Sequence, residues 1–129
     1  MHSKTFKLNG ATIEVAPETG AIYIDKMVAE ITLEVHSPDT PTRVAFHRQQ
    51  YAAAYAHSKI VDGHLGFEWP DSPNNKEAML TACDAWLQLP GNDVARWIST
   101  INEVQLPPND PDLLPAEMVS QKKGKSQKS

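Results

Sequence analysis

The stretch KTFKLNGATIEVA, residues 4–16, constrains the fold more than any other part of this sequence. Phe6 and Leu8 alternate with polar residues, which is the period of a strand with one buried face. Asn9 and Gly10 follow, and these two residue types adopt positive φ angles more readily than others. Ile13 and Val15 then alternate with polar residues again. The stretch therefore predicts a β-hairpin with a two-residue type I′ turn.

Further strands are predicted before residue 37. PETG at 17–20 is typical of a turn, and AIYI at 21–24 is compatible with a short third strand. AEITLEVH at 29–36 alternates more clearly, with Ile31, Leu33 and Val35 on one face and Glu30 and Glu34 on the other. These patterns predict an antiparallel sheet with one solvated face and one face that needs a cover.

Helices are predicted to provide that cover. The first is expected between a cap at Asp39 or Thr40 and a stop at Gly63, with Pro41 in its first turn. The second spans about 75–88 and the third runs from 93 to about 104, each with apolar residues at spacings of three and four. The apolar positions of the three helices are Val44, Tyr51, Ala52, Tyr55 and Ile60, then Ala78, Met79, Ala82, Cys83, Trp86 and Leu87, then Val94, Trp97, Ile98, Ile101 and Val104.

The order of these elements predicts an α+β fold, with a small N-terminal antiparallel β-sheet (the hairpin plus one or two strands), a three-helix bundle and an extended C-terminal arm. Residues 1–104 are expected to form a single domain, divided into a β-region at 1–36 and a helical region at 38–104. Residues 105–129 differ in composition: QLPPNDPDLLPAEM is proline-rich and expected to be extended, and VSQKKGKSQKS is polar, basic and expected to be disordered.

Charge and cysteine content narrow the class of protein. The formal net charge of -4 argues against a general nucleic-acid binder, because no basic field attracts phosphates. The basic tail lacks interleaved aromatic residues, which favours a solubilising role over RNA binding. A single cysteine fits a reducing compartment. The first ten residues lack the apolar run of a signal peptide, and no stretch approaches the roughly 20 apolar residues of a membrane helix. We expect a cytoplasmic protein with no nucleic-acid and no membrane partner.

The residues that usually carry chemistry form no catalytic or metal-binding pattern. Cys83 is expected in mid-helix on an apolar stripe, where core packing is favoured over a nucleophile, which needs a lowered pKa. Glu30 and Glu34 are expected to be solvated, and the glycines make no phosphate-binding loop. The histidines lack the pairwise spacing of zinc ligands, and all five are expected at the surface: His2, His36, His47, His57 and His64. We expect no enzyme activity, no cofactor and no metal.

The remaining apolar residues are suited to contacts with another protein. Trp86 and Trp97 either close two helices on each other as core or face a partner, and Trp69 is either a lid on the core or an exposed anchor. Leucines spaced between prolines form a pre-organised arm that loses little entropy on docking, in cis or in trans. The predicted partner-binding residues are Trp69, Trp86, Trp97, Ile101, Leu106, Leu113 and Leu114.

KTFKLNGATIEV, followed by helices and by AWLQLPGNDVARWISTINEVQLPPNDPDLLP, resembles the tail assembly chaperones of long-tailed bacteriophages and related prophages. The shared features are an aromatic-apolar helix, a Leu-Pro break, a second helix with Trp97 and Ile101, and an acidic proline arm. The resemblance implies a host-cytoplasmic protein that keeps the long helical tape-measure protein soluble until tail-tube subunits polymerise around it. Its docking surface would then include Met79, Trp86, Trp97 and Ile101. QKK at 121–123 also fits the ribosomal frameshifting that often gives such proteins a longer version.

Two alternatives to this chaperone remain open. A small structural virion protein, such as a tail or head-completion component, would join a neighbour through its hairpin and arm. It would form a ring or permanent complex, whereas a chaperone would bind transiently, and self-association is compatible with both. An enzyme would have to depend on Cys83 and the histidines, and fast alkylation of Cys83 in the native protein would support it.

Overall fold

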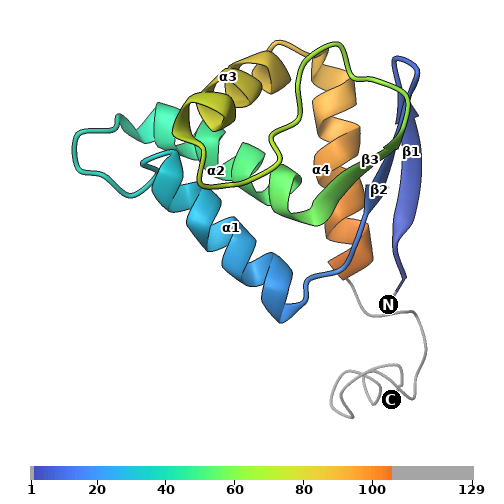
Figure 1. The fold of residues 1–129 in the computed structure, drawn as a ribbon, viewed down its shortest axis with the longest axis horizontal. Coiled ribbons are helices and arrows are strands. Elements are labelled where there is room, and N and C mark those ends of the chain that lie inside the picture. Colours follow the sequence, from blue (N-terminus) through green and yellow to red (C-terminus); the bar gives the residue numbers. More distant parts are fainter. Residues whose placement is uncertain (1, 106–129) are drawn as a thin grey trace, which may run out of the picture.

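The computed structural model describes residues 2–105. A three-stranded antiparallel sheet forms one side of the molecule and four helices form the rest (Figure 1). This architecture confirms the predicted α+β class. The elements in chain order are β1 (Lys4–Leu8), β2 (Ala11–Val15), α1 (Gly20–Thr32), α2 (Thr42–His57), β3 (Ser58–Asp62), α3 (Lys76–Leu87) and α4 (Gly91–Gln105).

The predicted N-terminal hairpin is confirmed. β1 and β2 pair antiparallel, and Leu8 stands opposite Ala11 at the turn. Asn9 and Gly10 have φ angles of 50° and 87°, as a type I′ turn requires. The side chains of β2 that point to the core are fully buried, and they are Ala11, Ile13 and Val15.

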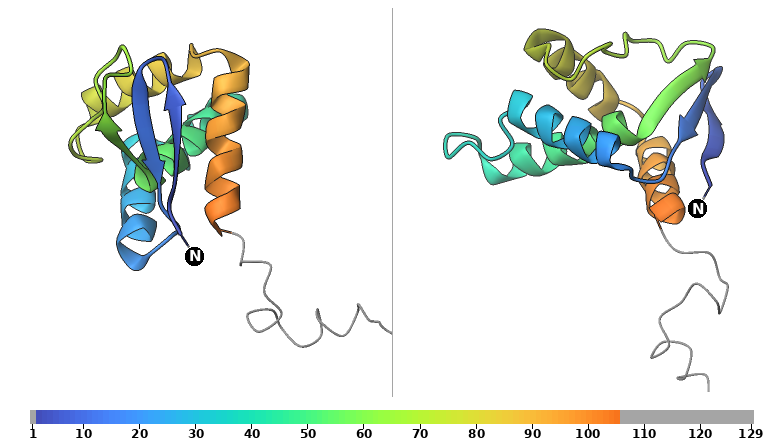
Figure 2. Two further views of the ribbon diagram at one scale, coloured as in Figure 1. Left: turned by 90° about the vertical axis from the view of Figure 1, so that its right-hand side faces the viewer. Right: turned by 60° about the horizontal axis from the view of Figure 1, so that its bottom comes forward.

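The third strand of the sheet is not the one that the sequence predicts. It is β3, which pairs antiparallel with β2 through Val15 opposite Ser58 and Ile13 opposite Ile60 (Figure 2). The register shifts by a β-bulge between Thr12 and Ile13. The strands predicted at 21–24 and 29–36 are wrong, because these residues belong to α1 and to the turn that follows it.

α1 forms because local hydrogen bonds satisfy both of its ends. At the start, Thr19 is the N-cap, and its Oγ1 accepts a hydrogen bond from the Ile22 N–H at 3.3 Å. At the end, Glu34 adopts a φ of 57°. The Val35 N–H then donates to the Glu30 carbonyl at 2.9 Å, which is the long hydrogen bond of a Schellman turn.

The alternation that predicted a strand at 29–36 arises from this turn. Leu33 and Val35 are both buried, but Ile31 is 70% exposed. The three side chains therefore do not share one face. The chain reverses direction after α1, so a spacing of two residues brings Leu33 and Val35 to the core without any strand.

α2 is shorter than predicted. Its N-cap is Pro41, which offers no side-chain hydrogen bond, so the predicted cap at Asp39 or Thr40 is wrong. The helix ends at His57, before the predicted stop. Ser58 takes an extended conformation, and the residues after it pair with β2. Helix and strand thus follow each other without a loop.

The two C-terminal helices are confirmed within a few residues. Asn75 caps α3 by accepting a hydrogen bond from the Ala78 N–H at 3.1 Å. α4 begins earlier than predicted because the Pro90 carbonyl already accepts from the Asp93 N–H at 2.9 Å. The predicted number of helices is wrong, since α1 adds a fourth helix where strands were expected.

The core lies between the sheet and the helices. α1 and α2 pack as an antiparallel pair, and α4 lies along β1 (Figures 1 and 2). Arg96 Nη2 donates to the Lys7 carbonyl at 2.7 Å. The Phe6 ring meets Trp97 edge-on at 5.6 Å between centroids. α4 therefore flanks the edge strand β1, which would otherwise present unpaired backbone groups.

The turn after β3 depends on the absence of a side chain at Gly63. A Cβ there would lie 2.0 Å from the Gly10 carbonyl oxygen, and the φ of Gly63 is 76°. Gly10 has a similar φ of 87°, but a Cβ on it would meet nothing within 4 Å. We predict that Gly63→Ala lowers the free energy of unfolding by about 3 kcal/mol, because strain and overlap add.

Gly10→Ala is the matched control for this substitution. It should lower the free energy of unfolding by only about 1–2 kcal/mol, which is the cost of a positive φ for a residue with a side chain. Urea titrations of both variants measure the difference. Equal losses of stability would contradict the close approach of Gly63 to the turn at Gly10.

Candidate functional site

Three of the four predicted partner-binding residues that the structure describes lie in the core. Trp86 and Trp97 are 0% exposed and Ile101 is 6% exposed. The two indoles meet edge to face with 6.0 Å between ring centroids, and Trp97 Nε1 donates to Ser58 Oγ at 2.8 Å. Met79 is also buried. Of the two alternatives for the tryptophans, core packing is the one observed, so these side chains offer no surface to a partner in this conformation.

Trp69 covers this core as a lid. Its half-buried ring stacks on Trp97 at 5.4 Å between centroids and 17° between planes. It also stacks on the Tyr55 ring, at 5.6 Å between centroids and 25° between planes. The Tyr55 hydroxyl donates to the Pro70 carbonyl at 3.0 Å and so holds the loop in place. The remaining predicted contacts, the arm residues Leu106, Leu113 and Leu114, lie outside the described residues.

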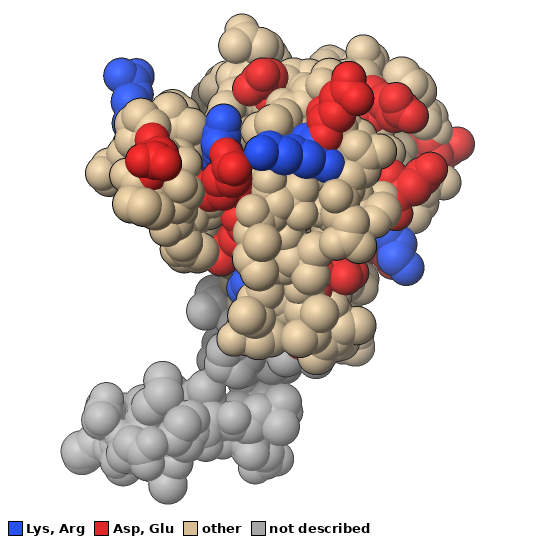
Figure 3. All heavy atoms as spheres, turned by 60° about the vertical axis from the view of Figure 1, so that its left-hand side comes forward, with Lys and Arg blue, Asp and Glu red and all other residues tan. Residues whose placement is uncertain are grey.

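The exposed apolar side chains of the described residues concentrate on α1. Four of the six large apolar residues with substantial exposure belong to this helix, and the other two are Phe46 on α2 and Val61 on β3. On the side of the molecule that bears α1, charged side chains gather above a broad uncharged area (Figure 3). We call the four residues the α1 outer face: Tyr23 (47% exposed), Ile24 (55%), Met27 (42%) and Ile31 (70%).

α1 is apolar on two opposite sides. Its inner side carries Ala29 and Leu33, which are 0% exposed and belong to the core. With about 100° between successive residues of a helix, Ile24 and Ile31 point away from this pair. A helix that is apolar all round is normally buried. Among the residues that the structure describes, α1 is covered on one side only, so its outer face is the candidate interaction surface.

The α1 outer face is missed when residues 21–24 and 29–36 are assigned to strands. The signal that identifies it is helical: Ile24, Met27 and Ile31 are spaced by three and then four residues. Thr19, as a cap before this run, is the second signal. Together they outweigh an alternation that covers only the last turn.

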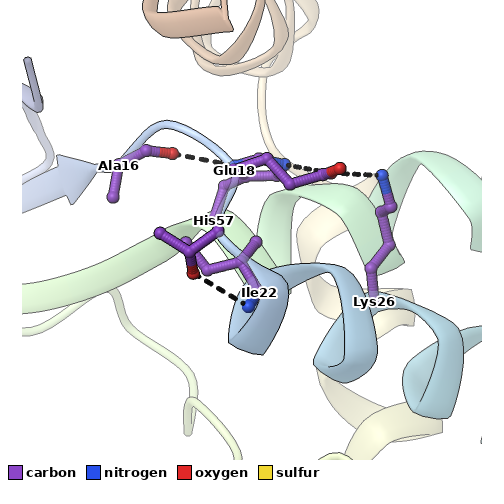
Figure 4. Close-up of polar contacts among 6 residues, drawn as sticks. Ala16, Glu18, Ile22, Lys26 and His57 are labelled. Carbon is purple, nitrogen blue, oxygen red and sulfur yellow. Dashed lines mark hydrogen bonds and ion pairs between the residues drawn. The ribbon is translucent and has the colours of Figure 1, made fainter. Parts of the chain in front are cut away.

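A cluster of polar groups surrounds His57, where α2 passes into β3 (Figure 4). The residue is 2% exposed, so the predicted surface position is wrong for this histidine. Its Nδ1 lies 2.8 Å from the Ala16 carbonyl oxygen, which can only accept, so Nδ1 carries a hydrogen. Its Nε2 has no hydrogen-bond partner. Glu18 Oε1 lies 3.6 Å from that nitrogen.

Glu18 connects this cluster to α1. Its Oε1 accepts a hydrogen bond from Lys26 Nζ at 2.7 Å (Figure 4). This hydrogen bond is the main reason that the pKa of the Glu18 carboxyl lies below its ordinary value. Desolvation acts in the opposite direction, and the charges of Lys26 and His57 add to the lowering. The cluster therefore fastens the chain between β2 and α1 to the end of α2.

A hollow of about 960 Å³ lies beside the cluster, between the start of α1, β3 and residues 69–71. Its carboxylates, Glu14, Asp25 and Asp71, outnumber its single lysine. His57 forms part of the wall, but its Nε2 is closed off from solvent. In this conformation Nε2 therefore offers no direct contact to a molecule in the hollow.

Cys83 also belongs to the core, as expected. The residue is 1% exposed. Burial raises the pKa of its thiol to about 12, and the charge of Asp84 acts in the same direction. A nucleophile needs the thiolate, which is scarce at such a pKa. Within residues 2–105, no three His, Cys, Asp or Glu side chains come together in a way that could hold a metal ion.

Comparison with protein-family models, with curated proteins and with solved structures finds no match to this chain. Of the helices that the structure describes, none combines the length and the apolarity that crossing a bilayer needs.

The lowered pKa of Glu18 predicts an acid sensitivity that one substitution should reduce. A carboxyl with a folded-state pKa below its unfolded value stabilises the fold above the unfolded pKa. That contribution disappears as the pH falls through the folded pKa. We predict that Glu18→Gln lowers the free energy of unfolding at pH 7 and flattens its decline below about pH 4.

Urea titrations at pH 7 and pH 3 measure this effect. Glu103→Gln is the control, because it breaks a pair with Lys4 in which both side chains are about half exposed. Such a pair contributes about 0–1 kcal/mol. If the free energy of unfolding of Glu18→Gln falls between pH 7 and pH 3 as steeply as that of the unsubstituted protein, the Glu18 pairing does not stabilise the fold.

The burial of Cys83 predicts slow alkylation. At pH 8 we expect iodoacetamide to modify the native protein at least roughly a hundredfold more slowly than the protein unfolded in urea, because the buried thiol is protonated and shielded. Mass spectrometry at timed intervals measures both rates. Comparable rates would restore the enzyme hypothesis.

Proposed function

We propose that the protein is a non-enzymatic binding protein whose α1 outer face receives an apolar helical segment of another protein. The observation that carries this proposal is the uncovered apolar stripe on α1, where Ile24, Met27 and Ile31 follow the spacing i, i+3, i+7. Helix recognition commonly uses anchors at these positions. Met27 adds an adaptable side chain, which suits contacts with more than one sequence.

The size of the face favours weak and reversible binding. Burying a fully exposed large apolar side chain stabilises a complex by about 1.5–3 kcal/mol. The four side chains are about half exposed, so together they contribute on the order of 4 kcal/mol. Association costs at least about 4 kcal/mol in lost translation and rotation. A stable complex therefore needs several contacts along a longer partner, whereas a single contact is transient.

We assign this binding to phage tail assembly, with the protein as a host-cytoplasmic chaperone of the tape-measure protein. Residues 4–15 and 85–115, which resemble phage tail assembly chaperones, support the assignment. A long helical partner fits the short α1 outer face, because it would present many apolar segments to it. The burial of Trp86 and Trp97 moves the docking surface of this proposal from α3 and α4 to α1.

Co-expression with the long helical protein encoded directly downstream tests this function. The partner should become soluble only when the full chain is present, and the chain alone should not form a large closed assembly. A discrete ring that ignores this partner would instead identify a structural virion component. Light scattering after size-exclusion chromatography distinguishes the two outcomes.

Charged substitutions on the α1 outer face should abolish capture of the partner. We predict that Ile24→Glu with Ile31→Glu lowers the amount of co-purified partner at least about tenfold, because each glutamate would lose its hydration in the contact. The protein itself should stay folded, since both positions are more than half exposed.

Val61→Glu is the matched control. Val61 is an apolar residue with a similar exposure of 52%, but it lies on β3. Capture should be retained in this variant. Equal loss in both variants would place the contact elsewhere or point to a general effect of added charge.

A further inference from the structure

The chain leaves the described structure close to the start of α1. α4 ends at Gln105, at the end of the molecule where α1 begins (Figures 1 and 2). Leu113 and Leu114 follow this point within nine residues. At about 3.1 Å per residue, a proline-rich segment of that length reaches about 25 Å. α1 has 13 residues and is about 20 Å long. The segment is long enough to extend along the whole helix.

The composition of residues 106–129 matches what the α1 outer face lacks. The face needs apolar side chains against it, and the segment supplies Leu106, Leu113, Leu114, Met118 and Val119. Four prolines between residues 107 and 115 restrict the unbound chain, so less entropy is lost on docking. Proline lacks an N–H donor, which suits contacts through side chains better than pairing with a strand edge.

We propose that residues 106–119 dock on the α1 outer face of the same molecule and cover it until a partner displaces them. The docking follows from the residues above, whereas the displacement rests on the proposed function. A tethered segment has an effective concentration in the millimolar range. It therefore outcompetes a second copy of the chain at micromolar concentration for a face of this size. A partner with several apolar segments can still displace it.

Thiol accessibility in the full chain tests this docking. Met27→Cys places a reactive thiol in the middle of the face, where 42% of the residue is exposed, while Cys83 is buried and reports separately. The rate of maleimide labelling at this thiol is compared with the rate after the additional changes Leu113→Ser and Leu114→Ser. We expect labelling to become about tenfold faster, because the covering side chains no longer bind.

Two controls make the result specific. Val61→Cys carries its thiol on β3 and should label at the same rate with or without the serine substitutions. Asp110→Asn with Asp112→Asn keeps both leucines and should leave the rate at position 27 unchanged. Circular dichroism checks that each variant keeps its helices.

Protein concentration separates the possible occupants of the face. Protection that is unchanged on tenfold dilution and lost with the leucines supports docking within one molecule. Protection that disappears on dilution would overturn the proposal in favour of a second copy. Equal labelling rates with and without the leucines would overturn it outright. Capture of the partner by α1 is tested separately with the glutamate variants, so either proposal can fail alone.

Discussion

His57 and Ser58, the two residues at which α2 becomes β3, join the main parts of the structure. The Ala16 N–H donates to the His57 carbonyl at 2.9 Å, and His57 Nδ1 returns a hydrogen bond to the Ala16 carbonyl at 2.8 Å. Ser58 Oγ accepts from Trp97 Nε1. The pair thus links α2, the end of β2 and α4. Both residues are buried, where each unsatisfied polar group would cost about 1–3 kcal/mol.

This junction also determines how α1 is placed. The chain between β2 and α1 is held by the Ala16 contacts with His57, and Glu18 is held by Lys26. α1 is therefore anchored at its start and packed along its inner side by Ala29 and Leu33. Its outer face takes no part in this packing. About half of the surface of these four residues is exposed to water, and an exposed apolar patch of this kind is the observation behind the proposed interaction.

The aromatic residues show why a binding surface is hard to locate from sequence. Trp86 and Trp97 lie on amphipathic helices, and the same spacing of apolar residues serves a core and a docking groove equally well. Only the neighbours decide between them. Trp97 is enclosed by Trp86, Trp69 and Phe6, and its N–H is satisfied by Ser58. The face that is left uncovered belongs instead to Tyr23, Ile24, Met27 and Ile31.

The sequence by itself determined the elements whose signals are local. Asn9 and Gly10 require a type I′ turn whatever surrounds them, and α3 and α4 each repeat the helical period over three turns, so these predictions hold. The burial of Cys83 follows from the same period. Tertiary structure decided the rest. β3 is a strand because β2, far away in the chain, offers it a partner, and His57 can be buried because the Ala16 carbonyl accepts a hydrogen bond from its Nδ1. Around Ile31, Leu33 and Val35 a helix end and a strand give the same pattern, so only packing against the core could choose between them.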